Sequence, residues 1–404
     1  MSTTESKAEL ILSKAISGKR ISSEEALILF REAPLHELGD AANQIRRKLH
    51  PDSKAVTFVG DRNINYTNAC TAACRFCAFA YWPGDKNVYK LEYSVIQDKI
   101  KELIEAGGTQ LLLQGGHNPE LGIEYYEDLF QKIRSDFPSV TLHALSPSEI
   151  DHITQVSNLS LEETIVRLKN AGWQSLPGGG AEILVKRVRD ILSPLKTSSE
   201  RWLEIMKIAH QNGIHGSATM MFGHVETYAE RIEHMQRLRE LQDETNGFRA
   251  FISWTFQPGD TPLSKDVQRL RESPPNPLDR GNFKAPPVKE AGEVIQGGGG
   301  DLGSGDGLDY LRTQAISRIF LDNFENIQAS WVTQGFAIGQ LALHYGANDF
   351  GGTMMEENVV SAAGTKHSKS NTRELIYQIN KAGFKAAQRD TFYNIIREFN
   401  LSKV

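Results

Sequence analysis

The stretch KLEYSVIQDKIKELIEAGGTQLLLQGG, residues 90–116, contains a helix pattern followed directly by a strand pattern. Apolar residues recur every three or four positions from Leu91 to Ile104, which predicts a helix with one buried face. Gly107 and Gly108 are a typical stop signal for that helix. The continuous apolar run in TQLLLQGG is typical of a strand that is buried on both faces of a parallel sheet. The stretch therefore predicts one unit of a parallel α/β structure.

The same alternation continues on both sides of this unit. Strand-like segments recur between about residues 55 and 256, with helix-like segments between them, and give six units. Six or more such units favour a (β/α) barrel over an open sheet. Segments 308–324, 326–332 and 339–346 supply two further units. The sequence therefore predicts the α/β class and a TIM-type (β/α) barrel of eight units, with helical extensions at both ends.

Three parts are expected along the chain. Residues 1–54 form an N-terminal helical extension, residues 55–365 form the barrel, and residues 366–404 form a C-terminal helical segment. Within the barrel, residues 258–307 are rich in Pro, Gly and charged side chains and are too long for an ordinary connection. This segment is either a mobile lid or an insertion without a catalytic part.

The composition favours an enzyme with a small-molecule substrate. The chain of 404 residues has 45 Lys and Arg against 50 Asp and Glu, a net charge of −5, and no basic block of the kind that binds nucleic acid. The N-terminal residues carry scattered acidic side chains and no apolar core, unlike a secretion signal or a transit peptide. No run approaches the roughly 20 apolar residues of a membrane helix. We therefore expect a cytoplasmic protein with neither a nucleic-acid nor a membrane partner.

All the cysteines of the chain, Cys70, Cys74 and Cys77, fall in one loop after the first predicted barrel strand. In a (β/α) barrel that loop lies at the face that carries the active site. Three thiols leave one unpaired in any disulfide arrangement, which indicates a reducing compartment. A zinc site would need a fourth ligand such as His117 or His143. In a [4Fe–4S] cluster, three cysteines hold three corners and leave one iron open for a methionine-derived ligand. A buried, purely structural trio is the third alternative.

The spacing C-x-x-x-C-x-aromatic-C, with Phe76 as the aromatic residue, resembles the signature of the radical S-adenosylmethionine (SAM) enzymes. Longer stretches resemble the menaquinone and deazaflavin-cofactor branch of that family. Within it, WTFQPGDT (254–261) and QASWVTQG (328–335) resemble the dehypoxanthine futalosine cyclases. The resemblance covers about residues 60–365. It implies a barrel that holds a [4Fe–4S] cluster on the three cysteines, uses SAM, and takes electrons from an external carrier such as flavodoxin or ferredoxin.

The resemblance also implies which residues contact SAM. QGGHN (114–118) follows the second strand, where the family has a glycine-rich segment beside the methionine amino group. The glycines would allow close backbone approach, and a tight turn without a ligand is the alternative explanation. In PGGGAEI, the acidic residue is a candidate polar partner of SAM, and the aromatic residue between the cysteines would shape the wall beside the adenine. The expected SAM-binding residues are Phe76, Gln114, Gly115, Gly116 and Glu182.

For the cyclases, the resemblance implies a substrate, dehypoxanthine futalosine, in which a ribose is joined through a ketone-bearing chain to a benzoate ring. A 5'-deoxyadenosyl radical would remove the hydrogen from C4' of the ribose, and the carbon radical would add to the ring. Loss of an electron and a proton then restores aromaticity, which needs a general base and a group that holds the carboxylate. The expected catalytic residues at strand ends are His143, His224 and Glu356, with Gln257, Asp349 and Glu357 as further candidates.

Two other functions stay open at this point. The sister aminofutalosine synthases share PGGGAEI (177–183) and MMFGHVET (220–227), and their reaction adenosylates an enolpyruvyl benzoate. A non-catalytic iron–sulfur or zinc protein would use the cysteines without turning over SAM. The first alternative differs in its product, and the second predicts no 5'-deoxyadenosine.

Overall fold

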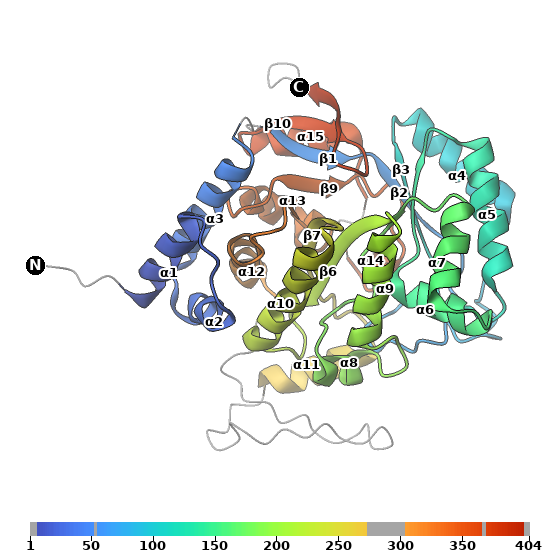
Figure 1. Cartoon of the computed structure of the whole chain (residues 1–404), viewed down its shortest axis with the longest axis horizontal. Helices are drawn as coiled ribbons and strands as arrows, with labels where there is room; N and C mark the ends of the chain where they lie inside the picture. The colour runs from blue at the N-terminus through green and yellow to red at the C-terminus, as the bar shows by residue number, and fades with distance from the viewer. Residues whose placement is uncertain (1–5, 52–54, 273–303, 366–368, 400–404) are drawn as a thin grey trace, which may run out of the picture.

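The computed structural model describes residues 6–51, 55–272, 304–365 and 369–399 (Figure 1). All strands in these ranges belong to one sheet, in the order β11-β10-β1-β9-β8-β7-β6-β5-β4-β3-β2. The strands are β1 (Ala55–Val59), β2 (Asp61–Asn65), β3 (Gln110–Gln114), β4 (Thr141–Ala144), β5 (Ser175–Leu176), β6 (His215–Phe222), β7 (Phe248–Thr255), β8 (Asn326–Gln328), β9 (Asp349–Gly352), β10 (Lys385–Arg389) and β11 (Ile395–Phe399).

The sheet closes into a ring through the segment at residues 55–65. Only Gly60 separates β1 from β2, and a Cβ at Gly60 would lie 2.9 Å from the Cα of Gly108. β1 pairs in parallel with β9, while β2 pairs in parallel with β3. The seven strands from β3 to β9 and this one continuous segment therefore make eight positions around a ring. This arrangement confirms the expected TIM-type (β/α) barrel.

Helices cover the outside of the ring (Figure 1). The helix predicted within residues 90–108 is α4, and Gly107 follows it with φ of +76°, a conformation that favours glycine. The helices of the barrel are α4 (Tyr93–Glu105), α5 (Ile123–Asp136), α6 (Pro147–Val156), α7 (Leu161–Asn170), α8 (Lys186–Leu192), α9 (Ser199–Gln211), α10 (Tyr228–Thr245), α12 (Gly307–Phe320), α13 (Trp331–Ala342) and α14 (Val359–Ala362).

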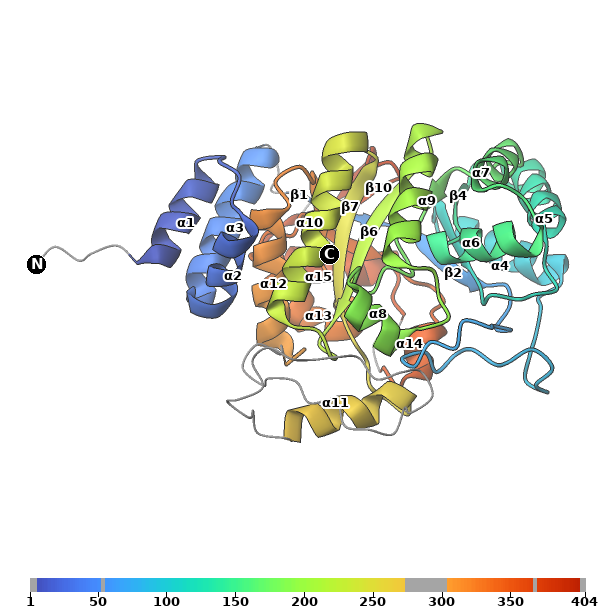
Figure 2. The ribbon, with the colours of Figure 1, turned by 60° about the horizontal axis from the view of Figure 1, so that its bottom comes forward.

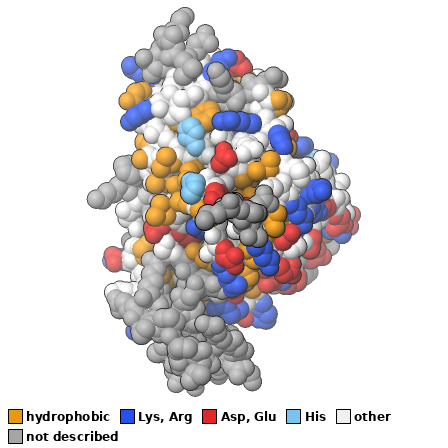
Figure 3. All heavy atoms as spheres, turned by 90° about the vertical axis from the view of Figure 1, so that its left-hand side faces the viewer, with side chains coloured by type: hydrophobic (Ala, Val, Ile, Leu, Met, Phe, Trp, Pro, Cys, Tyr) orange, Lys and Arg blue, Asp and Glu red, His pale blue; other side chains and the backbone are white. Residues whose placement is uncertain are grey.

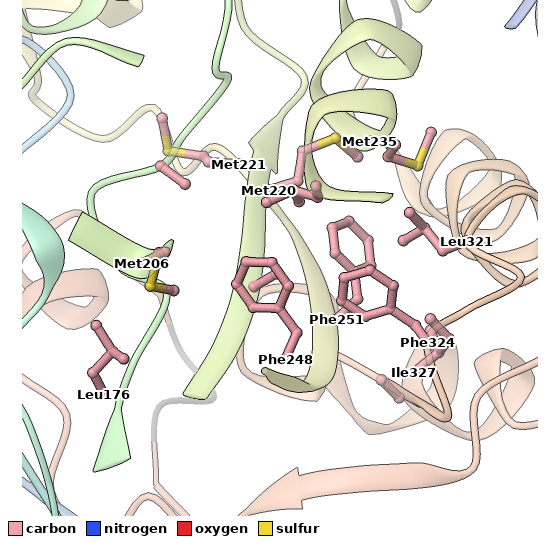
Figure 4. Packing of buried hydrophobic residues seen from close by; sticks show 14 of the residues in the cluster. Leu176, Met206, Met220, Met221, Met235, Phe248, Phe251, Leu321, Phe324 and Ile327 are labelled. Carbon is pink, nitrogen blue, oxygen red and sulfur yellow. The ribbon is translucent and has the colours of Figure 1, made fainter. Parts of the chain in front are cut away.

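Buried apolar side chains fill the layer between the ring and its helices (Figure 4). Beside β6 and β7, Phe248 stacks on Phe324 with ring centroids 5.5 Å apart, and Phe251 meets Phe324 edge to face at 6.2 Å. Met220 and Met235 are buried in the same cluster. Because side chains alternate across a strand, this outward-facing set leaves the other set to line the lumen.

Three helices precede the barrel, as the sequence predicts: α1 (Lys7–Ile16), α2 (Ser23–Glu32) and α3 (Leu35–Leu49). They pack on one another, and α2 and α3 also pack on α12. Ser22 caps α2, since its hydroxyl accepts a hydrogen bond from the Glu25 N–H while the Glu25 carboxylate accepts one from the Ser22 N–H. Acidic and basic side chains are interspersed on the face that carries these helices (Figure 3). Among the described helices, none has the length and apolarity needed to cross a bilayer.

The C-terminal segment differs from the helical expectation for residues 366–404. It contains α15 (Thr372–Lys381), but β10 and β11 follow this helix as an antiparallel hairpin. β10 joins the barrel sheet in parallel beside β1. The sequences of the two strands, KAAQR and IIREF, lack the continuous apolar run that marks the barrel strands. In addition, β11 is largely exposed. Pairing of β10 with β1 stabilises a strand conformation that the local sequence alone does not favour.

The segment at residues 258–307 is described only in part. It begins with α11 (Pro262–Glu272), which contacts the cysteine loop: the Leu263 N–H donates a hydrogen bond to the Arg75 carbonyl oxygen (3.0 Å), and Arg75 forms an ion pair with Asp266. Figure 2 shows α11 at the same edge of the molecule as α8 and α14. Residues 273–303 lie outside the described ranges, so the choice between a lid and an insertion stays a prediction.

His234 on α10 is fully buried and is held in its neutral form. Its Nδ1 accepts a hydrogen bond from the Leu184 N–H (2.9 Å), and burial lowers the pKa of His234 to about 3. An unfolded chain keeps histidine near a pKa of about 6.5. Below that pH the unfolded state binds more protons than the folded state, so the free energy of unfolding falls as the pH drops from 6.5 toward 3.

We expect His234→Gln, which can still accept from the Leu184 N–H but does not titrate, to lose less stability on acidification. Between pH 7 and pH 5 the difference in unfolding free energy between variant and wild type should shift by about 2 kcal/mol in favour of the variant. Urea unfolding at the two pH values measures this shift. His36→Gln, at a histidine whose side chain is 83% exposed, is the matched control. If the difference in unfolding free energy between His234→Gln and the wild type were the same at both pH values, the expectation would be contradicted.

Candidate active site

The lumen of the barrel contains a cavity of about 320 Å³. Residues two apart along a barrel strand face it together: Asp61 and Asn63 on β2, and Gln110, Leu112 and Gln114 on β3. An open lumen with polar side chains among apolar ones contrasts with the packed apolar interior of most such barrels and indicates a ligand site. The other lining residues include His143, Ser175, Glu182, Thr219, Arg249, Trp254, Gln328, Trp331, Glu357 and Arg389.

The cysteine loop lies between β2 and α4, at the carboxyl end of the ring. The Cys70 N–H donates to the carbonyl oxygen of Tyr81 (2.9 Å), and the Tyr81 N–H donates to that of Asn68 (2.9 Å), which folds the loop back on itself. Within this loop, the Cys77 N–H donates a hydrogen bond to the carbonyl oxygen of Cys74 (3.1 Å). Backbone hydrogen bonds therefore keep the three cysteines in one compact loop.

The thiols are partly or largely buried and influence one another. Burial raises the pKa of Cys74 to about 12, the positive charge of Lys196 opposes this rise, and the other two cysteines add to it. Burial also raises the pKa of Cys77. All three cysteines are free of disulfides. Loss of their protons on binding a metal centre would be favoured by the nearby ammonium of Lys196.

The donor chemistry of this loop fits an iron–sulfur cluster. Three sulfur atoms come from one loop at the active-site face, beside a buried positive charge. Within the described ranges, no three His, Cys, Asp or Glu side chains are already arranged as a ligand set, so the fit rests on the donors and their place in the barrel. His117, a candidate fourth ligand for zinc, instead stacks on His152 with ring centroids 5.0 Å apart.

Gly115 and Gly116 are required by the packing of the protein itself. A Cβ at Gly115 would lie 2.6 Å from Cζ of Tyr66, and a Cβ at Gly116 would lie 2.1 Å from the carbonyl oxygen of Ala69. The Gly115 N–H donates to Oε1 of Glu149 (2.8 Å). The close backbone approach expected for SAM is thus made by Tyr66 and by the cysteine loop, and a contact of these glycines with SAM stays a prediction.

We expect Gly116→Ala to displace the cysteine loop, because the new Cβ would also lie 2.9 Å from Cβ of Cys70. The variant should bind much less iron per chain than the wild type after anaerobic reconstitution, while its far-ultraviolet circular dichroism remains that of the folded barrel. Gly122→Ala is the matched control, since its Cβ would meet only the ends of the Glu124 and Ser157 side chains. Full iron loading of Gly116→Ala would contradict the steric requirement.

The other three expected SAM contacts gather at the mouth of the lumen. Gln114 and Glu182 both line the cavity. Glu182 forms ion pairs with Lys196 (3.2 Å) and Arg189 (3.6 Å), yet its buried Oε2 accepts no hydrogen bond. The Lys196 ammonium also lies 5.7 Å from the ring centroid of Phe76. Lys196 therefore links Phe76 and Glu182 to the cysteine loop, and Glu182 retains an oxygen that a ligand could use.

His143 lines the lumen, and Ser175 determines its tautomer. Ser175 Oγ donates its single proton to the carbonyl oxygen of His215 (2.8 Å), so it accepts a hydrogen bond from Nδ1–H of His143 (2.9 Å). The Nε2 atom of His143 is consequently unprotonated. Burial, together with the charge of Arg389, lowers the pKa of His143 to about 3. His143 is therefore neutral and only a weak base.

Two of the expected catalytic residues are not among those that line the cavity. His224 is buried beside Glu226, with Nδ1 2.8 Å from Oε2. Glu356 accepts hydrogen bonds from Arg62 (3.0 Å) and pairs with Lys99; burial alone would raise the pKa of Glu356, but these partners lower it. A strand-end side chain points either into the lumen or toward the surrounding helices, and a catalytic role for these two residues stays a prediction.

The further candidates are also engaged in structural contacts. Glu357 lines the cavity, but its carboxylate accepts the N–H groups of three residues at the start of α14. Asp349 is held by Arg389 through two contacts, Nε to Oδ2 (2.5 Å) and Nη2 to Oδ1 (3.1 Å). Gln257 folds back on Thr255. In the described ranges, the side chains of all three residues are thus occupied by contacts within the protein.

Asp61 was not among the residues expected from the sequence. Its Oδ1 accepts a hydrogen bond from the Met354 N–H (2.8 Å), and its Oδ2 has no partner in the described ranges. Burial raises the pKa of Asp61 to about 6. The sequence carried a signal, because Asp61, Asn63 and Asn65 are polar at alternate positions of a strand in which every residue is buried. Such a pattern places a polar face in the lumen.

Two family models match the chain. Residues 64–238 match the Radical SAM superfamily, and residues 299–401 match the CofH/MqnC C-terminal region. Two curated relatives named cyclic dehypoxanthine futalosine synthase, from Halalkalibacterium halodurans and Streptomyces coelicolor, are 46% and 45% identical to it. Both alignments cover 96% of this chain, and they cover 95% and 89% of the respective relatives.

More distant relatives carry other names. An aminodeoxyfutalosine synthase from Thermus thermophilus is 35% identical over 96% of this chain and 95% of the relative. Among solved structures, the FeFe-hydrogenase maturase HydG from Carboxydothermus hydrogenoformans is similar with a TM-score of 0.68 at 14% identity, over 96% of this chain and 80% of that chain. At this identity the likeness shows a shared fold alone.

Proposed function

This chain belongs to the radical SAM superfamily, in the branch of the cyclic dehypoxanthine futalosine synthases, and on that premise we propose that it converts dehypoxanthine futalosine to cyclic dehypoxanthine futalosine. This reaction belongs to the futalosine route to menaquinone. The observation that carries the proposal is the cysteine loop at the mouth of a lumen that holds polar side chains among apolar ones. A cavity of about 320 Å³ there is suited to a small molecule.

Enzymes of this superfamily use a [4Fe–4S] cluster and SAM, and here Cys70, Cys74 and Cys77 would hold the cluster. When bound, these cofactors supply a 5'-deoxyadenosyl radical, which removes a hydrogen atom from C4' of the substrate ribose. Glu182 would accept a hydrogen bond from SAM through Oε2, which has an ion pair with Arg189 but no hydrogen bond, and Gln114 lines the same cavity. Phe76 would border the adenine.

The helix α11 is held against the cysteine loop by two contacts with Arg75. The Leu263 N–H donates to the Arg75 carbonyl oxygen, and Arg75 pairs with Asp266, so α11 is tied to the cysteine loop from both its backbone and its side chains. A radical formed beneath α11 would be shielded from solvent and from side reactions.

The ring radical left by ring closure regains aromaticity by losing one electron to a one-electron acceptor of the carrier class and one proton, and two lumen residues have an unprotonated atom that can accept the proton. Burial gives Asp61 a pKa of about 6, whereas burial gives His143 a pKa of about 3. A general base works best when its pKa lies near the working pH, and at neutral pH Asp61 is both ionised and the stronger base. We therefore assign the proton transfer to Asp61 Oδ2. His143, the base expected from the sequence, would instead accept a hydrogen bond at Nε2 from a substrate hydroxyl.

The reaction needs an external one-electron carrier of the flavodoxin or ferredoxin class. The cysteine loop ends at Tyr81 and Trp82, which are 38% and 58% exposed. This surface would give a carrier access to the cluster. We expect turnover to stop when the carrier and all other reductants are omitted.

Identification of the products tests the proposed function against the aminofutalosine-type alternative. With dehypoxanthine futalosine, SAM and a reductant, the anaerobically reconstituted chain should give 5'-deoxyadenosine and the cyclised product. The aminofutalosine-type reaction, whose named relative is 35% identical against 46% for the cyclase, would instead give an adenosyl adduct from an enolpyruvyl benzoate. Stoichiometric zinc without any 5'-deoxyadenosine would favour a non-catalytic protein.

A further inference from the structure

A β-bulge determines the position of Arg249. The pairing of β6 with β7 joins Gly216 to Phe248 and Ser217 to Ala250, so Arg249 is the extra residue between the two pairs. A bulge of this kind redirects a side chain and is frequent beside active sites. Arg249 and Ala250 consequently both line the lumen. The bulge places a guanidinium at the amino end of β7, opposite the mouth that carries the cysteines.

The guanidinium of Arg249 has no protein partner in the described part of the chain. No side-chain hydrogen bond or ion pair there includes it, and its Nε is buried without a partner. The other arginine that lines the cavity, Arg389, is paired through two contacts with Asp349. A buried donor without an acceptor is costly, and Nε of Arg249 is such a donor. Among the described residues that line the lumen, Arg249 is therefore a cation without an anion.

The positive charge of Arg249 lowers the pKa of two neighbouring histidines, His210 and His215. Burial is the main cause that lowers the pKa of His210 to about 3, and Arg249 lowers it further. Burial and then Arg249 likewise lower the pKa of His215. No carboxylate contributes to either effect. Arg249 therefore lies close to two histidines whose neutral forms it favours.

We propose that Arg249 binds the carboxylate of an aromatic-acid substrate at the amino end of the lumen. The inference rests on the proposed function, whose substrate carries a benzoate group. Nε and one terminal nitrogen of a guanidinium form two parallel hydrogen bonds with a carboxylate. One unpaired cation balances one negative charge. A monoanion is therefore favoured over a phosphate dianion, because the lumen already contains the Asp61 carboxylate.

The anchor would orient the whole substrate. Arg249 and Trp254 both line the cavity and are five residues apart on β7, about 17 Å along the strand. A carboxylate held at Arg249 directs the rest of the molecule toward Trp254 and the cysteine loop. The ribose would then face SAM, and analogues without the acid would be rejected because Arg249 would stay unpaired.

Two probes of similar shape test the anchor without turnover. 3-Acetylbenzoate carries the charge and 3-acetylbenzamide does not. Ligand-observed NMR with the reconstituted wild type should show tighter binding of the benzoate. Arg249→Gln should weaken benzoate binding roughly 10- to 100-fold and leave amide binding unchanged. Arg249→Lys, which keeps the charge but not the paired donors, should lie between the two.

The matched control is Arg237→Gln on α10, where the arginine pairs with Glu200 and Glu233 away from the cavity. This variant should bind both probes as the wild type does. Equal affinity of the wild type for both probes, or benzoate binding that survives in Arg249→Gln, would overturn the proposal. Benzoate binding that depends on Arg249 in a protein that does not cyclise dehypoxanthine futalosine would support the anchor and refute the proposed function.

Discussion

Changing Cys74 to Ala is expected to abolish formation of 5'-deoxyadenosine. Cys74 is one of three sulfur donors in a loop that contains every cysteine of the chain, so no other thiol can replace it. The wild type should bind about four iron and four sulfide per chain after reconstitution, and the variant should not retain that content. Chemical iron and sulfide analysis and chromatography of the SAM products measure both effects. Cys70→Ala and Cys77→Ala should behave in the same way.

The barrel itself should survive this change. Cys74 lies in a loop outside the strands and helices, so the thermal unfolding of the metal-free protein should stay close to that of the wild type. Thr71→Ser is the matched control in the same loop, because it retains the hydroxyl that donates to the His117 carbonyl oxygen (3.2 Å). A Cys74→Ala variant with wild-type release of 5'-deoxyadenosine would contradict the assignment of the cysteines.

Changing Asp61 to Asn is expected to lower the rate of cyclised product formation roughly 10²- to 10⁴-fold, the usual contribution of a general base. The amide retains an oxygen for the Met354 N–H but cannot take the proton. In the wild type the rate should fall as the pH drops through about 6, because Asp61 becomes protonated, and the variant should lack this dependence. His143→Gln should cost less, since His143 is the weaker base.

The same variant should be more stable than the wild type. An unfolded chain holds aspartate near a pKa of 3.8, while burial raises the pKa of Asp61 to about 6 in the folded chain. The folded state therefore becomes less stable as the pH rises from 3.8 to 6, and ionised Asp61 costs about 3 kcal/mol at pH 7. Asp61→Asn removes this cost, which urea unfolding at pH 7 would detect. A variant that is both fully active and no more stable would contradict the role of Asp61.

Local patterns predicted most of the fold. The periodicity of residues 90–108 predicted α4, because helix formation there depends on neighbours three and four positions away. The cysteine loop could also be recognised from local sequence, because its three sulfur donors lie within eight residues of one another. Strand β10 was missed because it depends on pairing with β1, which is more than three hundred residues away in the sequence, and β11 depends in turn on pairing with β10.

The lumen residues were harder to predict because they depend on closure of the ring. His143 and His224 both follow strand-like sequence, yet one lines the cavity and the other is buried against Glu226. Arg249 gave no signal in the sequence, because a shift in the register between β6 and β7 decides where its side chain points. Asp61 could have been found from the alternation of polar residues in DRNIN, had that segment been recognised as a strand.

One isotope experiment tests the central claim most directly. Dehypoxanthine futalosine labelled with deuterium at C4' is incubated anaerobically with the reconstituted chain, SAM and a reductant, and the products are analysed by mass spectrometry. The 5'-deoxyadenosine should carry one deuterium, and the cyclised product should have lost it. Unlabelled 5'-deoxyadenosine formed together with cyclised product that retains the deuterium would contradict hydrogen abstraction from C4'.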